Sequence, residues 1–186
     1  MSTLEVGTIA PISGSNDVTL GGSSKNIKFA SGTTVDFSTN TPTVSGLPNN
    51  TPAWKAGLEN SLNLSSATNT IIPFDSEFFD TDNAYDTSNG RFTVPSGKAG
   101  KYFIYLFFRF QTTDTNFDTN AQIFKNGSRI AQTGGRVSVY PSLIVNCTAD
   151  LAVGDYIQGS AYQSSGNTVG LTSSNTYTMI GGFKLT

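Results

Sequence analysis

From residue 52 to the end of the sequence, apolar and polar residues alternate in short runs, and no stretch keeps a helical period. The runs are rich in Val, Ile, Phe, Tyr and Thr, and Gly, Pro, Asn and Asp separate them. They predict strands over 69–74, 91–94, 100–112, 120–125, 128–132, 140–151, 156–162 and 176–184. Between two of these runs, Asn126-Gly127 is the dipeptide most typical of a tight hairpin turn. Strands without helices predict an all-β sandwich or jelly roll.

The run over 100–112 is the most apolar part of the chain. It lacks the regular polar positions of a strand with one side in water, so we expect a central strand that is buried on both faces. One face would fill the core of the sandwich. The other face needs a second apolar cover, supplied either by neighbouring subunits or by the rest of the same chain.

Residues 1–50 differ in composition and pattern, with many Gly, Ser and Thr residues and very short apolar alternations. Alternating triplets begin at Val18, Ile27 and Val35, nine and then eight positions apart. Three-residue strands are too short to form a stable sheet alone, but a short repeat allows rungs to stack or chains to intertwine. We therefore expect a β-rich stalk over 1–50, with a flexible linker as the alternative, followed by a hinge over 47–52.

Charge and composition exclude several classes of function. The chain has no His, which excludes His-dependent triads, His-ligated zinc and imidazole switches. Its single Cys, Cys147, lies in an apolar strand and is expected to be a small packing residue. The net charge of −2, without a basic patch, argues against nucleic acid as a partner. There is no apolar run of about 18 residues and no signal-like start, so we expect synthesis in a cytosol and no membrane insertion.

An ordered set of short motifs covers residues 52–186. They are Pro52-Ala53-Trp54-Lys55-Ala56, Ile72-Pro73-Phe74-Asp75, Asn83-Ala84-Tyr85-Asp86, Gly90-Arg91-Phe92-Thr93-Val94-Pro95, Gly100-Lys101-Tyr102-Phe103, Lys125-Asn126-Gly127, Val153-Gly154-Asp155-Tyr156 and Gly182-Phe183-Lys184-Leu185. Together they resemble the globular head of the complement first component's q subunit, whose jelly roll is shared with the tumour necrosis factor superfamily. The resemblance implies a ten-stranded jelly-roll head over 51–186 that forms a homotrimer. There is no Gly-X-Y repeat before it, so the stalk is not collagen.

The segments 4–9, 31–37 and 78–86 resemble appendage proteins of marine and cyanobacterial bacteriophages. This resemblance implies a virion protein, assembled in the host cytoplasm, in which residues 1–50 dock to other virion proteins and the head forms a trimeric knob. The expected function is that of a tail fibre or spike whose knob contacts a glycan or protein of the host surface. The alternative is a capsid decoration or head-fibre protein that stabilises the shell.

The only dense group of carboxylates is Asp75, Glu77, Asp80, Asp82 and Asp86. Oxygen ligands at this density suit Ca²⁺, but the spacing does not match an EF-hand loop, and holding turns is the other role open to them. A pair of carboxyls from this stretch would also be needed for a polysaccharide hydrolase, which is the least favoured function. We predict no enzyme, no metal and no cofactor.

Aromatic side chains could offer a stacking platform for sugars, or they could fill the core or a subunit interface. The candidates are Trp54, Tyr140, Tyr156, Tyr162 and Tyr177. The loops over 113–119, 134–138 and 164–175 are rich in Ser, Thr, Asn and Gly. We expect these loops at the outer end of the jelly roll, where recognition usually takes place.

Overall fold

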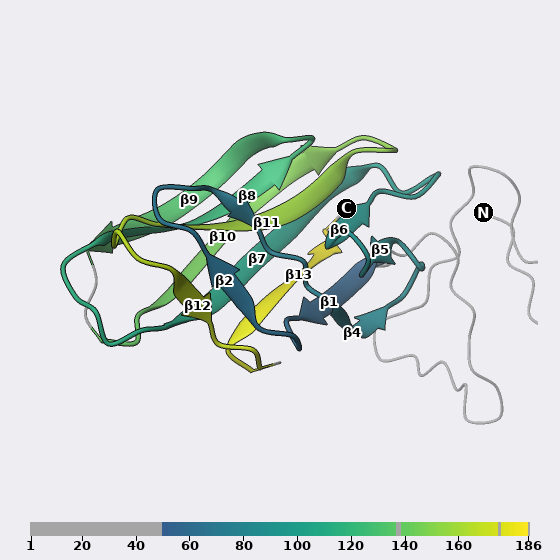
Figure 1. Cartoon of the computed structure of the whole chain (residues 1–186). Helices are drawn as coiled ribbons and strands as arrows, with labels where there is room; N and C mark the ends of the chain where they lie inside the picture. The colour runs from purple at the N-terminus through teal and green to yellow at the C-terminus, as the bar shows by residue number, and fades with distance from the viewer. Residues whose placement is uncertain (1–49, 137–138, 175, 186) are drawn as a thin grey trace, which may run out of the picture. The chain divides into compact units, whose positions relative to one another are not determined.

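The computed structural model describes residues 50–136, 139–174 and 176–185. Residues 1–49, which make up nearly all of the predicted stalk, lie outside the described residues. Within the described part every regular element is a β-strand, so the all-β prediction is confirmed (Figure 1). No helix in this part is long and apolar enough to cross a membrane.

The described residues form thirteen strands. In chain order they are β1 (Ala53–Gly57), β2 (Leu62–Leu64), β3 (Thr70–Ile71), β4 (Ser76–Asp80), β5 (Tyr85–Asp86), β6 (Arg91–Thr93), β7 (Gly100–Gln111), β8 (Asp118–Lys125), β9 (Ser128–Arg136), β10 (Ser142–Leu151), β11 (Tyr156–Gln163), β12 (Val169–Leu171) and β13 (Thr178–Lys184).

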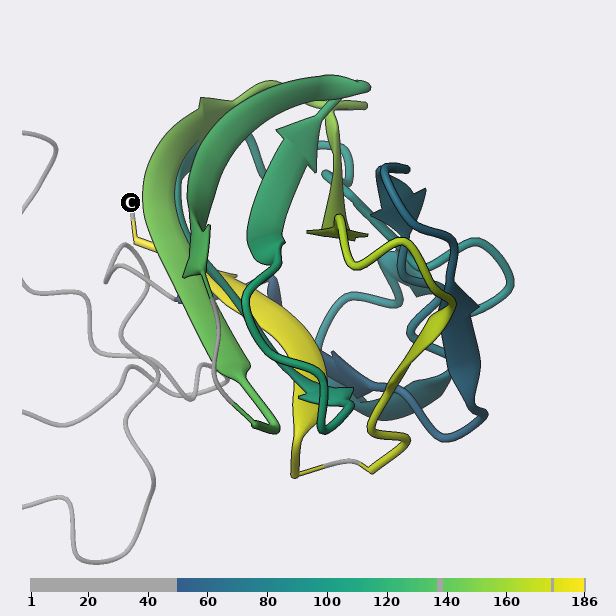
Figure 2. The same ribbon diagram turned by 60° about the vertical axis from the view of Figure 1, so that its left-hand side comes forward.

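The strands pair into two antiparallel sheets that curve around a common interior (Figures 1 and 2). In the larger sheet the strands follow the order β10-β7-β13-β1-β4, and β12 and β2 extend it from the end of β7. The smaller sheet has the order β5-β6-β11-β8-β9, with β3 beside β11. Two facing sheets with long-range pairings of this kind make a jelly-roll sandwich.

All eight predicted runs contain a strand. The five strands that the pattern missed, β1, β2, β4, β5 and β12, have two to five residues each. Such short segments show too little alternation to stand out from loops. The described residues form thirteen strands where the resemblance implies ten, and five of the thirteen have only two or three residues each.

Aromatic and aliphatic side chains from the facing sides of both sheets form one core. Strand β7 contributes every second residue to it, namely Tyr102, Ile104, Leu106, Phe108 and Phe110, all fully buried. From β1 of the larger sheet, the Trp54 ring stacks on Phe92 of the smaller sheet, with ring centroids 3.6 Å apart. This stack ties the two sheets together.

The other side of β7 is not covered by the chain itself. Phe103, Tyr105, Phe107 and Arg109 alternate with the core residues and are only half-buried. The alternative that the rest of the same chain covers the second face of 100–112 is therefore wrong, and cover by neighbouring subunits stays a prediction. One sandwich has only one interior, and a strand within it directs alternate side chains away from that interior.

Two adjacent glycines in β13 leave room for large side chains, one on each side of the larger sheet. A Cβ on Gly182 would lie 2.5 Å from the Trp54 ring and 2.7 Å from the Phe103 carbonyl oxygen. A Cβ on Gly181 would collide with the Tyr105 side chain on the opposite side. One glycine therefore admits Trp54 to the core, and the other lets Tyr105 lie flat across the outside.

The chain enters and leaves the larger sheet at the same end. The Lys184 N–H donates to the Pro52 carbonyl oxygen over 2.9 Å, and the Leu185 N–H donates to the Lys101 carbonyl oxygen over 2.7 Å. We call this the proximal end. The loops after β7, before β10 and after β11 lie at the opposite end of these strands, which we call the distal end (Figure 1).

One carboxylate holds two turns together at the proximal end. Asp155 forms an ion pair of 2.8 Å with Lys125 and accepts hydrogen bonds from the Asn126 side chain and the Ala152 N–H. The hydrogen bond from Lys125, followed by those from Asn126 and Ala152, lowers the pKa of Asp155 to about 2. The Asn126-Gly127 hairpin, predicted from the sequence, is thereby joined to the turn before β11. Asn126 and Gly127 both have positive φ angles, as a tight hairpin turn requires.

Replacement of Gly182 by Ala should lower the free energy of unfolding by about 1–3 kcal/mol, because the new methyl group overpacks a core that has no room for it. Chemical denaturation measures the change. Gly135→Ala is the matched control, since nothing lies within 4 Å of that Cβ position. Equal stability of the two variants would contradict the account given for Gly182.

Replacement of Asp155 by Asn should cost about 1–2 kcal/mol at pH 7, because charge-assisted hydrogen bonds are lost. The folded-state pKa is about 2, below the unfolded value of about 3.9, so this stability is present above pH 4 and disappears as the pH falls through 2. Denaturation of both proteins at pH 7 and at pH 2 tests this sign. Asp150→Asn should change little at either pH, because the Asp150–Lys101 pair is largely exposed.

Candidate functional site

The outward side of the larger sheet carries a continuous apolar surface, which we call the aromatic face. Its half-buried central residues are Phe103, Tyr105, Phe107, Met179 and Phe183. They come from the neighbouring strands β7 and β13, where the register places Phe183 beside Phe103 and Met179 beside Phe107. Facing residues of paired strands lie on the same side of a sheet, so these side chains form one surface.

Tyr105 and Gly181 make the middle of the aromatic face flat. Gly181 lies beside Tyr105 in the register, and it is buried beneath the Tyr105 side chain. Burial raises the pKa of the Tyr105 hydroxyl. Phe103 packs against both Tyr105 and Phe183, with ring centroids 6.5 Å and 5.6 Å apart. A flat surface of packed rings is suited to contact with another protein surface.

Both edges of the aromatic face end in exposed apolar side chains. On edge strand β4, Phe78 and Phe79 are 44% and 49% exposed, and the Lys55 Nζ lies 4.5 Å from the centre of the Phe78 ring. On edge strand β10, Ile144 is 60% exposed. In the register Ile144 lies directly beside Phe107, whereas Lys55 lies between Phe79 and Gly181. Large apolar side chains at this exposure, on both edges of a half-buried aromatic surface, mark an interaction site.

At the distal end of the aromatic face, Arg109 continues the outward side of β7. Its guanidinium carbon lies 5.1 Å from the centres of both the Tyr140 and the Tyr177 rings. Two of the five aromatic candidates thus meet around a residue that the sequence analysis did not select. The signal was present in the sequence, since Arg109 is two positions after Phe107 on the same side of the strand.

The other three aromatic candidates are separate from this cluster. Trp54 is fully buried in its stack on Phe92, so of the two roles open to it the structure shows the core role: it joins the two sheets. Tyr156 lies beneath the guanidinium of Arg91, at 3.8 Å. Tyr162 is half-buried in β11 of the smaller sheet. The five residues do not make one platform.

The predicted recognition loops meet at the distal end. The Arg136 guanidinium lies 3.5 Å from the Asp118 carboxylate and donates to the Asn116 side chain over 2.6 Å. The Ser164 N–H donates to the Asp118 carbonyl oxygen over 3.0 Å. Phe117 is buried against the Phe110 ring and fixes the first loop to the core. The described parts of 113–119, 134–138 and 164–175 are therefore neighbours.

Two carboxylates of the acidic stretch organise the chain around β4. The Asp80 carboxylate accepts hydrogen bonds from three backbone N–H groups, those of Asp82, Ala84 and Tyr85. Asp82 pairs with Lys98 at 2.8 Å. Partial burial alone would raise the pKa of Asp82, but the hydrogen bond and the charge of Lys98 lower it overall.

Of the remaining carboxylates of the stretch, two accept hydrogen bonds from nearby residues and one is exposed to solvent. Asp75 accepts from the backbone of Glu59 and Asn60, and Asp86 accepts from Ser88. The Ser88 hydrogen bonds lower the pKa of Asp86. Glu77 is exposed in β4. Among the described residues no three Asp, Glu, Cys or His side chains gather as metal ligands would, and the carboxylates are placed as turn-holding groups.

Cys147 lies on the inward side of β10 and packs at the margin of the core. It is half-buried, and burial raises the pKa of its thiol. A protonated thiol is a weak nucleophile, so its place agrees with the predicted packing role.

No protein-family model and no curated protein matches the sequence. Solved structures match it over the head. A crystal structure of murine APRIL has a TM-score of 0.53 at 17% identity and covers 72% of this chain and 98% of that chain. The globular domain of zebrafish complement 1qA has a TM-score of 0.50 at 14% identity and covers 73% of this chain and 98% of that chain.

The Eiger TNF of S. frugiperda has a TM-score of 0.51 at 10% identity and covers 72% of this chain and 92% of that chain. The three structures share with this chain the two-sheet sandwich described above. The head therefore has the jelly-roll fold of the tumour necrosis factor and complement q domains, as its motifs predicted.

Proposed function

We propose that this chain is a non-enzymatic virion protein that forms a homotrimer through the aromatic face and presents the distal loops to a host surface. The observation that carries the proposal is the aromatic face itself, an apolar surface that the single chain leaves open. A free monomer would keep this surface in water, whereas an assembly buries it and gains the corresponding hydrophobic free energy.

A closed trimer joins two different patches of the same surface, because a cyclic contact of three subunits is heterologous. The aromatic face has two such patches, one at each edge. Phe78 and Phe79 on β4 of one subunit would meet the β10 edge with Ile144 of the next. The choice of three subunits comes from the resemblance to the complement q and tumour necrosis factor heads.

The two ends of the head support separate tasks. The chain enters at Pro52 at the proximal end, so a segment that docks to other virion proteins would leave the distal end free. A trimer presents three copies of every distal loop, and three weak contacts with one surface give a much longer attachment than one.

The virion setting rests on the resemblance of 4–9, 31–37 and 78–86 to bacteriophage appendage proteins. In the described part, 78–86 contains the Asp80 turn between β4 and β5. Labelling of purified particles with an antibody against the head tests the setting. Label at the tail supports a fibre or spike, label over the shell supports the capsid decoration or head-fibre alternative, and unlabelled particles contradict a virion role.

The trimer is tested by introducing opposite charges on the two sides of the proposed contact. Sedimentation of the full chain at micromolar concentration should give a trimer. Phe79→Lys and Ile144→Glu should each dissociate it, because each places a single charge in an apolar contact. The double variant should recover the trimer, because the introduced lysine of one subunit would then face the introduced glutamate of the next.

Rescue within one subunit is ruled out by distance. Strands β4 and β10 are separated by β1, β13 and β7, which puts the two positions roughly 19 Å apart. Ile130→Lys, on β9 of the smaller sheet, is the control and should leave the trimer intact. A wild-type chain that sediments as a folded monomer contradicts the trimer. Single variants that dissociate without rescue contradict only the pairing of the two edges.

A further inference from the structure

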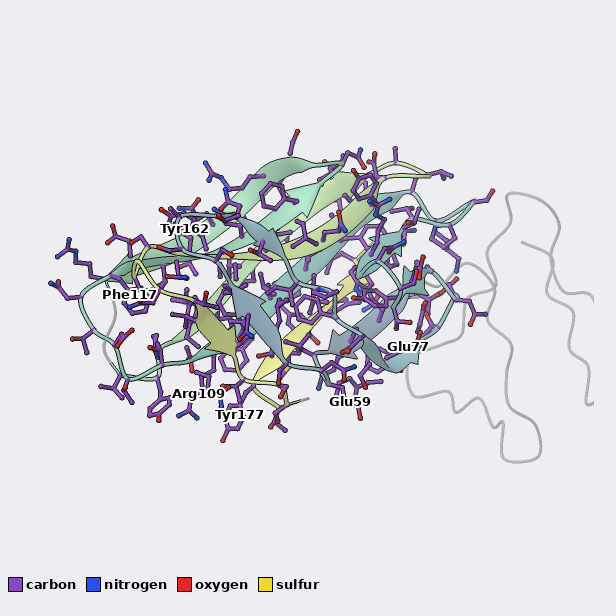
Figure 3. All side chains as sticks on the ribbon, in the orientation of Figure 1. Glu59, Glu77, Arg109, Phe117, Tyr162 and Tyr177 are labelled. Atoms are coloured by element: carbon purple, nitrogen blue, oxygen red, sulfur yellow. The ribbon has the colours of Figure 1, made fainter. Side chains whose placement is uncertain are left out.

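The cluster of Tyr140, Arg109 and Tyr177 at the distal end has the features of a binding site. The guanidinium lies 5.1 Å from the centre of each ring, and the two tyrosines are 44% and 43% exposed. Figure 3 shows Arg109 and Tyr177 next to each other at the margin of the head. A planar cation thus lies near two aromatic rings that are both partly open to solvent.

The backbone fixes both tyrosines. Tyr177 closes a turn in which its own N–H and that of Thr178 donate to the Ser174 carbonyl oxygen, over 2.9 Å and 3.0 Å. Tyr140 has a φ of 51°, in the left-handed region that residues with side chains seldom occupy. Its N–H donates to the Thr112 carbonyl oxygen over 2.9 Å, which holds this conformation. Strained residues held in this way often serve a function.

Arg109 is also the side chain in the cluster whose charge is not neutralised. In the described part of the chain, ion pairs involve Lys98, Lys101, Lys125 and Arg136, and none involves Arg109. Its guanidinium forms no hydrogen bond with another described residue. The five N–H donors in their fork are therefore available to an acceptor from outside the chain, and a carboxylate or phosphate fits that fork.

The residues that border the cluster indicate what kind of anion it would bind. Ser142 lies beside Arg109 in the register, and Ser174 and Thr176 lie beside Tyr177, so hydroxyl groups border the cluster. No carboxylate of the described residues forms an ion pair there. Tyrosine rings pack against the apolar face of a sugar ring, hydroxyls bind its edge, and the arginine binds an acidic substituent.

We propose that Arg109, Tyr140 and Tyr177 form a site for an anionic sugar, a pyranose ring that carries a carboxylate or a phosphate. The proposal deepens the proposed function and rests on it for the setting, since a trimer would present three such sites at the end that faces the host. Each site lies within one subunit, so binding itself does not depend on the trimer.

The competing occupant of Arg109 is a carboxylate of a second subunit. Arg109 belongs to the same side of β7 as the aromatic face, and the exposed Glu59 follows β1 two positions after Gly57, which pairs with Met179 of β13. An Arg109–Glu59 contact between subunits would use the same donors. The experiment therefore measures both sugar binding and the state of assembly.

The test uses calorimetric titration of the full chain with three probes: trigalacturonic acid, its methyl ester and galactose 6-phosphate. The acid and its ester differ chiefly in charge, and the phosphate tests the second source of negative charge. We expect at least one anionic probe to bind about tenfold or more tightly than the uncharged ester. Arg109→Gln should weaken that binding by about tenfold to a hundredfold, the range for a charge-assisted hydrogen-bonded contact.

Two further variants separate the rings from the charge. Tyr177→Phe should bind nearly as well as the wild type, whereas Tyr177→Ala should bind less tightly, because the ring face and not the hydroxyl makes the contact. Arg136→Gln is the matched control: it removes an arginine from the same end, but one that already pairs with Asp118 and Asn116. Its affinity should equal that of the wild type.

Several results would overturn the site. Equal affinity for the acid and its ester, no binding of either anionic probe, or an equal loss in Arg136→Gln would each do so. Dissociation of the assembly by both Arg109→Gln and Glu59→Gln would assign Arg109 to a subunit contact instead. Binding that depends on Arg109 in a chain that sediments as a monomer would support the site while contradicting the trimer.

Discussion

A β-strand directs alternate side chains to opposite sides of its sheet, so an unbroken apolar run cannot be hidden by one sandwich core. In β7 the core takes Tyr102, Ile104, Leu106, Phe108 and Phe110, which leaves Phe103, Tyr105 and Phe107 facing outward. The same division appears in β13, where one glycine makes room for Trp54 inside and the next makes room for Tyr105 outside. Two apolar surfaces on one sheet lead to the sandwich within the chain and to the association proposed between chains.

Sequence patterns were sufficient for the architecture of the head because its long strands have strong alternation and clear turns. The Asn126-Gly127 hairpin forms between β8 and β9, and each of the eight predicted runs contains a strand. Short strands such as β2 and β5 were missed, since two or three residues have no period of their own. Burial on both faces of 100–112 was inferred from composition, whereas the structure shows that register decides which residues the core accepts.

The candidate site was harder to predict, because its residues come together only through the topology. Tyr140 and Tyr177 were selected as aromatic candidates, but they are far apart in sequence and meet at Arg109 because β10 and β13 both pair with β7. Trp54 had the same aromatic character and is buried in the core. The acidic stretch is dense enough in oxygen ligands for calcium, yet Asp80 binds the backbone of its own turn, Asp75 binds the backbone of Glu59 and Asn60, and Asp82 pairs with Lys98. The spacing of residues within the stretch does not reveal these partners.

The hydrogen bond between Lys184 and Pro52 sets the entry and the exit of the jelly roll side by side, at the end remote from the distal loops. The chain therefore joins the head at the end that is remote from the contacts among the distal loops. A head with this layout is suited to transfer onto an unrelated shaft, because a new junction at residue 52 leaves those loop contacts in place.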